Sequence, residues 1–118
     1  MFKASIEYKD SDKISFLLIL QRVSGYSSDA IPLSREKVEM LLQCTEEALA
    51  KNFDGSLSHG DFCRYIGLQL NSHFLLSLNL NDVIYKGYDL SIHQLKLLKA
   101  SIKNALNRAD NELEEASG

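Results

Sequence analysis

The chain has 118 residues, of which 45% are hydrophobic and 25% are charged, and its formal net charge is −3. These values are typical of globular proteins and exclude a disordered chain. At this length we expect a single domain over residues 1–118. The longest apolar run, residues 16–20, is too short to span a membrane, and the residues after Met1 do not form a signal peptide. We therefore expect a cytoplasmic protein without a membrane partner.

The first elements are two strands. Phe2, Ala4, Ile6 and Tyr8 alternate with polar residues, which is the period of a strand with one buried face. Turn-forming residues at 10–13 separate this strand from a second, more apolar strand over 14–23. The two strands predict a hairpin. Residues 24–32 are rich in turn formers and predict a linker.

A helix follows this linker. Ser34 is a suitable N-cap, and Leu33 and Val38 flank it as a hydrophobic staple. An apolar stripe continues to about Lys51, so the first repeat spans 1–52. Residues 53–61 are then predicted to be a connecting loop.

The second half repeats this order over residues 62–115. Strands are predicted over 62–70 and 74–80, a loop over 81–89, with at most a short strand at 83–85, and a helix from Ile92, capped by Ser91. Leu95, Leu98, Ala105 and Leu106 follow Val38, Leu41, Ala48 and Leu49 at one constant separation. The sequence therefore predicts an α+β fold in which two β-β-α repeats form an antiparallel sheet with both helices on one face.

The face of this sheet away from the helices supplies the candidate binding residues. Ser77 and Asn79 mark this face in the second repeat, and Leu75 shares it. The equivalents of Leu75 and Ser77 in the first repeat are Leu17 and Ile19, which are therefore predicted to point outward, as residues at a protein interface do. Tyr26 and Tyr85, in the predicted loops, are further candidates for partner binding. Met40 and Leu42 are surplus apolar residues on the first helix and predict a homodimer interface.

No segment carries the signature of a catalytic, cofactor or metal site. Residues 50–61 resemble part of a calcium-binding loop, but Ala50 stands at the first ligand position and Asp61 at the last. His59, Cys44 and Cys63 leave a fourth zinc ligand unassigned, and free thiols are expected for the two cysteines. We expect no metal, no cofactor and no enzymatic activity.

Lysines at helical spacing give the second helix a basic stripe: Lys96, Lys99 and Lys103, with Arg108 beyond. The chain is acidic overall, and an acidic segment follows the stripe. A solvated helix face is therefore the ordinary interpretation, and nucleic-acid binding through this stripe is a secondary alternative.

The order of elements from Leu33 onward resembles the class I chaperones of bacterial type III secretion. Met40-Leu41-Leu42 with Ala48-Leu49-Ala50, then 65–68, 75–80 and 95–98, follow the family's leucine-rich helix, two strands and long C-terminal helix. The resemblance implies a cytoplasmic bacterial homodimer that binds an extended effector segment along its sheet. The alternatives are a stoichiometric inhibitor, such as a toxin-immunity or phage anti-defence protein, and the nucleic-acid binder.

Overall fold

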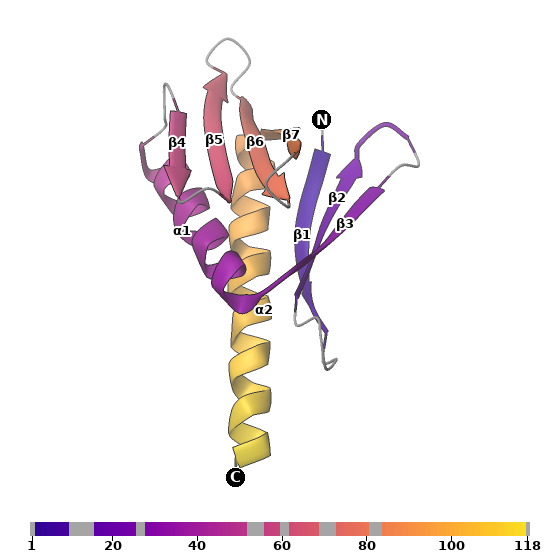
Figure 1. Cartoon of the computed structure of the whole chain (residues 1–118), viewed down its shortest axis with the longest axis vertical. Helices are drawn as coiled ribbons and strands as arrows, with labels where there is room; N and C mark the ends of the chain where they lie inside the picture. The colour runs from indigo at the N-terminus through magenta and orange to yellow at the C-terminus, as the bar shows by residue number, and fades with distance from the viewer. Residues whose placement is uncertain are drawn as a thin grey trace.

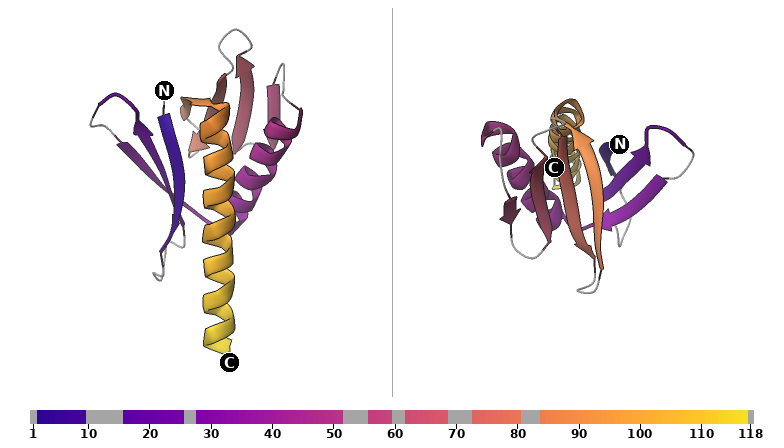
Figure 2. Two further views of the ribbon diagram at one scale, coloured as in Figure 1. Left: turned by 180° about the vertical axis from the view of Figure 1, so that it is seen from behind. Right: turned by 90° about the horizontal axis from the view of Figure 1, so that it is seen from above.

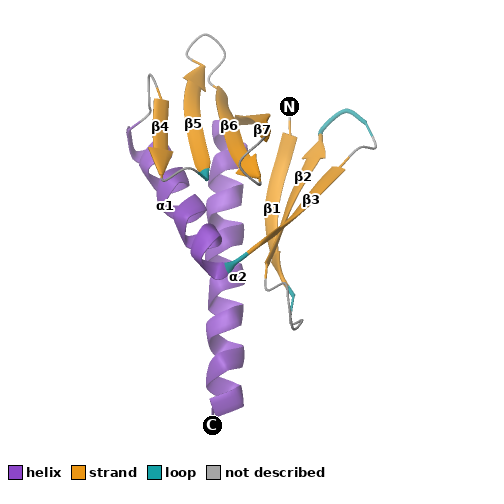
Figure 3. Cartoon of the chain, in the orientation of Figure 1, coloured by secondary structure: helices purple, strands orange, loops and turns teal. Residues whose placement is uncertain are grey.

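The elements of the chain form two separate antiparallel sheets and two helices (Figures 1 and 3). The computed structural model describes residues 2–9, 16–25, 28–51, 56–59, 62–68, 73–80 and 84–117. Within these ranges the order is β1 (Phe2–Tyr8), β2 (Phe16–Arg22), β3 (Ser28–Leu33), α1 (Arg35–Lys51), β4 (Ser56–His59), β5 (Cys63–Leu68), β6 (His73–Leu80), β7 (Ile84–Ser91) and α2 (Ile92–Ser117). Sheet one has the order β1-β2-β3 and sheet two the order β4-β5-β6-β7.

The α+β class is confirmed, and so are both helix starts. The backbone N–H of Lys37 donates to the Ser34 hydroxyl at 3.4 Å, and that of Gln94 donates to the Ser91 hydroxyl at 3.1 Å. Each serine thus pairs one of the amides that a first helical turn leaves without an intrahelical acceptor.

The prediction of a single sheet is corrected by the structure, because the strands divide into two sheets. Three further strands lie where loops were predicted. β3 lies within the predicted linker, β4 within the predicted loop 53–61, and β7 covers most of the predicted loop 81–89 and reaches Ser91. β3 was not predicted from the sequence because a proline, here Pro32, normally indicates that a segment is not a strand. β3 is an edge strand of sheet one, and there a residue can lack an N–H without breaking the ladder.

The added strands make the repeat closer than the sequence indicated. Phe16 pairs with Leu33 in sheet one, and Phe74 pairs with Leu90 at the same place in sheet two. Ile6 pairs with Leu18, and Tyr65 pairs with Leu76 in the equivalent register. Each half is therefore three strands followed by a helix, and β4 is an addition to the second half.

The two halves interlock through their helices. α1 packs on β4 and β5 of sheet two, whereas α2 packs along β1 of sheet one and also against α1 and β7. Figure 2 shows α2 between sheet one and α1, with its last turns extending beyond the sheets. The fully buried leucines Leu18, Leu41, Leu76 and Leu98 belong to one core that draws on both halves. Burying each contributes about 1.5–3 kcal/mol.

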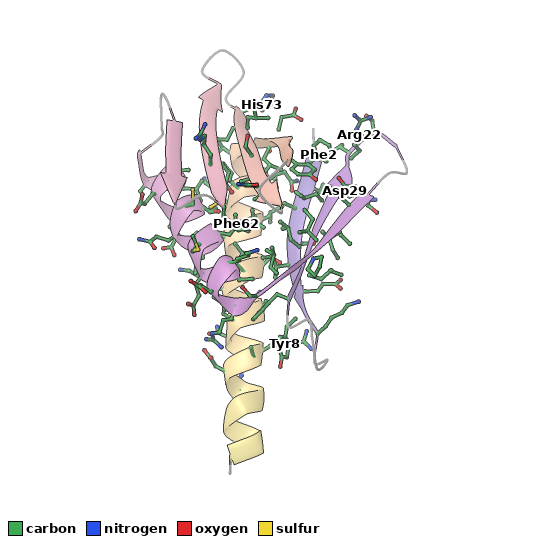
Figure 4. All side chains as sticks on the ribbon, viewed as in Figure 1. Phe2, Tyr8, Arg22, Asp29, Phe62 and His73 are labelled. Carbon is green, nitrogen blue, oxygen red and sulfur yellow. The ribbon has the colours of Figure 1, made fainter. Side chains whose placement is uncertain are left out.

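Aromatic contacts join the two sheets at one end. The rings of Phe2 and Tyr88 meet edge to face with centroids 5.0 Å apart, and the Tyr88 hydroxyl donates to Asp29 Oδ2 at 2.9 Å. The Arg22 guanidinium lies 5.9 Å from the centroid of the Phe2 ring. Figure 4 shows Phe2, Arg22 and Asp29 gathered at the same end of sheet one. This cluster fixes β3 and β1 against β7.

Helix α2 also covers the edge of β1. The Ile6 N–H donates to the Ser101 hydroxyl at 2.8 Å, and that hydroxyl donates to the Ile6 carbonyl oxygen at 3.1 Å. Cys44 is the equivalent of Ser101 on α1, and Tyr65 of β5 is the equivalent of Ile6; both are fully buried where α1 packs on β5. Each half thus packs a helix on the equivalent strand.

Candidate functional site: the outward face of sheet one and an adjoining groove

The outward face of sheet one carries the predicted apolar patch. Phe16, Leu18 and Leu20 are buried, whereas the alternating Leu17 and Ile19 are half-buried on the opposite face. Ile19 lies between Ser5 of β1 and Ala30 of β3, which are its cross-strand neighbours on this face. No charged residue is directly opposite Ile19, and of its two neighbours Ala30 extends the apolar surface whereas Ser5 is polar.

An open groove of about 510 Å³ runs beside this face, between sheet one and α2. We call it the β1–α2 groove. Its lining comes from β1, β2 and α2 and consists of Lys3, Ala4, Ser5, Ile19, Gln21, His93, Gln94, Leu97 and Ser101. Leu97 is 46% exposed, whereas Leu95 and Leu98 in the same part of α2 are fully buried. Ile19 and Leu97 are therefore apolar lining residues of the groove that are open to solvent.

The electrostatics of the groove differ from those of the whole chain. Among its lining residues, all of which the structure describes, Lys3 and His93 are the ionisable ones and none is a carboxylate. The chain as a whole is acidic, with a net charge of −3. The groove is accordingly suited to a segment that combines apolar and negatively charged side chains.

Of the other predicted partner-binding residues whose side chains the structure describes, Leu17 and Leu75 do not line this groove. Leu75 is half-buried on the outward face of sheet two, where a Cβ on Gly87 would lie 3.2 Å from Leu75 Cδ1. The glycine thus leaves room for Leu75 to lie across β7. Tyr26 lies outside the described residues, and so does the side chain of Tyr85, whose backbone is part of β7.

The predicted dimer residues lie on α1. Met40 and Leu42 are half-buried and pack against the core. Each side chain is therefore only partly exposed on the surface of α1, where the homodimer interface was predicted.

The side chains of Tyr65, Cys44 and Cys63, which carry ionisable groups, are buried and hydrogen-bonded. The Tyr65 hydroxyl is within 2.9 Å of Thr45 Oγ1, which itself donates to the Leu41 carbonyl at 2.7 Å. Burial raises the pKa of the Tyr65 phenol, and the hydrogen bond with Thr45 opposes this shift only in part. Hydrogen bonding to Cys63, together with burial, raises the pKa of the Cys44 thiol. Neither cysteine forms a disulfide, and the raised pKa keeps the Cys44 thiol protonated, which makes it a poor nucleophile.

In the described part of the chain, no three His, Cys, Asp or Glu side chains gather as metal ligands would. Of the calcium-like segment, residues 52–55 and 60–61 lie outside the described residues, and 56–59 form β4. Neither α1 nor α2, over the residues described, has an apolar stretch of the length and character that crossing a bilayer requires.

The basic stripe of α2 is interrupted by an ion pair. Lys99 Nζ lies 4.0 Å from Glu46 Oε2 of α1, while Lys96, Lys103 and Arg108 are exposed. The stripe thus borders an acidic helix, which lowers its attraction for a polyanion.

Sequence reasoning identified Ile19 but missed the α2 side of the groove. Leu97 stands outside the apolar stripe formed by Leu95, Leu98 and Ile102, and that departure was the available signal. Lys3 and His93 are polar residues in ordinary positions, and only the packing of α2 along β1 brings them together.

Comparisons with protein-family models, with curated proteins and with solved structures found no match. The resemblance to secretion chaperones therefore rests on the order of the sequence elements alone.

Proposed function

We propose that this protein is a non-catalytic protein-binding module that holds an extended segment of a partner along the outward face of sheet one and the β1–α2 groove. The observation that carries the proposal is the open β1–α2 groove itself, whose lining includes Ile19 and the 46% exposed Leu97. Clefts that combine apolar and polar lining residues are typical binding sites.

The shape of the site favours an extended segment over a globular ligand. The groove follows the β1 edge and the first three turns of α2, from His93 to Ser101, so a bound chain would lie along β1. Ser101 already pairs the Ile6 backbone, so at this point affinity would come from side chains in the groove and not from strand addition.

A secretion-type chaperone is the specific form of this proposal that the sequence pattern supports. Such a protein holds a non-globular segment of its effector and needs no catalytic group. The rigid contacts around the groove suit that role, because a preformed site loses less entropy when an extended segment binds.

The test is photo-crosslinking in cells of the source organism. A photoreactive amino acid at Leu97 should crosslink to a defined partner, because this position opens into the groove. The same amino acid at Lys103, which is exposed but lies outside the groove lining, is the matched control. Equal crosslinking at both positions, or none at Leu97, would contradict the proposal.

A further inference from the structure

The internal repeat supplies a second copy of the β1–α2 groove, between β5 and α1. Equivalent positions follow from the strand registers and the helix spacing. On the helices, Leu97 and Ser101 of α2 correspond to Met40 and Cys44 of α1. On the strands, Lys3 and Ala4 correspond to Phe62 and Cys63. The backbone supports this alignment, because Asn79 N–H donates to the Phe62 carbonyl at 2.9 Å where Gln21 faces Lys3 in sheet one.

The second copy is filled by an aromatic side chain of the chain itself. Phe62 is only 6% exposed, and the Lys37 ammonium lies 5.5 Å from the centroid of its ring. Cys63 Sγ approaches the Met40 carbonyl at 4.0 Å, so the strand closes onto the helix beside this ring. Figure 4 labels Phe62 at this place. Met40 is accordingly half-buried.

The first copy, the β1–α2 groove, has no aromatic side chain at the position of Phe62. Lys3 stands where Phe62 stands in the other half, and it is exposed to solvent. Leu97, the equivalent of Met40, is left 46% exposed, and the space remains as the open groove of about 510 Å³. One fold thus shows the same crevice occupied and empty.

We propose that the β1–α2 groove receives an aromatic side chain of the partner segment, in the place that Phe62 takes in the second half, with a carboxylate next to it in the partner. This deepens, and rests on, the proposed protein-binding function. Leu97 and Ile19 provide the apolar walls, and an aromatic ring would bury both. Lys3 provides a positive charge at the rim that a neighbouring Asp or Glu would meet, and the His93 side chain adds a polar group beside it.

The test uses a phage-displayed library of random linear peptides, selected on the purified wild-type protein. The selected peptides should contain Phe, Tyr or Trp beside Asp or Glu. Replacing the aromatic residue of a selected peptide by Ala should weaken binding about tenfold or more, measured by fluorescence polarisation.

Two variants of Lys3 separate the effect of filling the groove with an aromatic ring from the effect of removing the positive charge. Lys3→Phe should fill the groove as Phe62 fills the second copy and weaken binding of the selected peptides about tenfold or more. Lys3→Gln removes the charge without filling the groove, so it should retain the aromatic requirement and lose only the preference for acidic neighbours. Both variants should keep the wild-type circular dichroism spectrum, because Lys3 is exposed. Leu97→Asp gives an independent check and should abolish binding.

The outcomes distinguish the inference from the function on which it rests. If selected peptides need Leu97 but lack an aromatic residue, or bind Lys3→Phe as well as the wild type, the inference is wrong and the binding function stands. If no peptide is enriched, or the selected peptides bind Leu97→Asp normally, both the inference and the proposed function are overturned.

Discussion

The hydroxyl of Ser101 pairs both backbone groups of Ile6, accepting from its N–H at 2.8 Å and donating to its carbonyl at 3.1 Å. A side chain of α2 therefore takes the place of a neighbouring strand at the edge of β1. This contact also sets the distance between β1 and α2, and thus the width of the β1–α2 groove. Stability and the binding site depend on the same residue.

Ser101→Ala should lower the free energy of unfolding by about 1–3 kcal/mol, because the Ile6 backbone loses its partner in a half-buried place. Urea denaturation followed by circular dichroism measures this loss. Lys103→Ala, an exposed change two residues along the helix, should stay within about 0.5 kcal/mol of the wild type. Equal stability of the two variants would mean that water satisfies Ile6 and that α2 is not anchored at Ser101.

Ser91→Ala and Ser34→Ala should each cost about 1 kcal/mol through loss of an N-cap. Ser91 makes the shorter bond in a half-buried place, whereas the Ser34 bond is longer and exposed, so we expect Ser91→Ala to cost more. Denaturation midpoints of the two variants give the comparison. Loss at neither position would show that the helices begin elsewhere in solution.

The stability of the protein should fall in alkaline solution. Burial raises the pKa of the Tyr65 phenol and of the Tyr88 phenol, and the latter also donates to Asp29. The unfolded chain releases these protons near the ordinary tyrosine pKa of about 10. Stabilisation by the protonated phenols is therefore complete below about pH 10 and declines above it.

Tyr65→Phe should flatten this alkaline decline, and its cost at neutral pH should be about 1 kcal/mol because Thr45 keeps its bond to Leu41. Urea midpoints measured between neutral pH and about pH 11 supply the profile. A profile unchanged by Tyr65→Phe would show that this phenol ionises without unfolding the protein.

The homodimer prediction concerns Met40 and Leu42 on α1, both half-buried against the core. Sedimentation equilibrium at micromolar concentration should show a dimer, and Leu42→Asp should shift it towards monomer because a buried carboxylate without a partner is costly. Glu39→Asp, an exposed change on the same helix, is the control. A monomeric wild type would exclude this interface.

How far the sequence predicted this structure differs between helices and strands. The helices were placed closely because Ser34 and Ser91 sit just before long apolar stripes, and such signals are local. β3 and β7 were missed because their apolar residues stand among turn-forming ones; the buried ones are Ile31 and Leu33 in β3 and, among the described side chains of β7, Tyr88 and Leu90. Only pairing with β2 and β6 makes them strands.

Only the sheet side of the candidate binding site, and not the α2 side, was predictable from the sequence. The repeat placed Leu17 and Ile19 outward, because the polar residue Ser77 marks the equivalent face of β6, and the structure has them there. The sequence did not indicate that α2 would lie along β1, because the interlocking of the halves depends on contacts between segments far apart in the chain. The contrast between Lys3 and Phe62 has meaning only once the two halves are superposed by their strand registers.

The central claim is that a partner docks on the outward face of sheet one beside the β1–α2 groove, and paired aspartate substitutions in β2 test it most directly. Partner capture should be measured, together with thermal unfolding by circular dichroism, for Ile19→Asp and Leu18→Asp. Ile19 is half-buried on the outward face, so Ile19→Asp should remain folded and lose the partner that is crosslinked at Leu97. Leu18 is fully buried, so Leu18→Asp should unfold the protein. If Ile19→Asp folds and still captures this partner, or unfolds as completely as Leu18→Asp, the outward face of sheet one is not the docking surface.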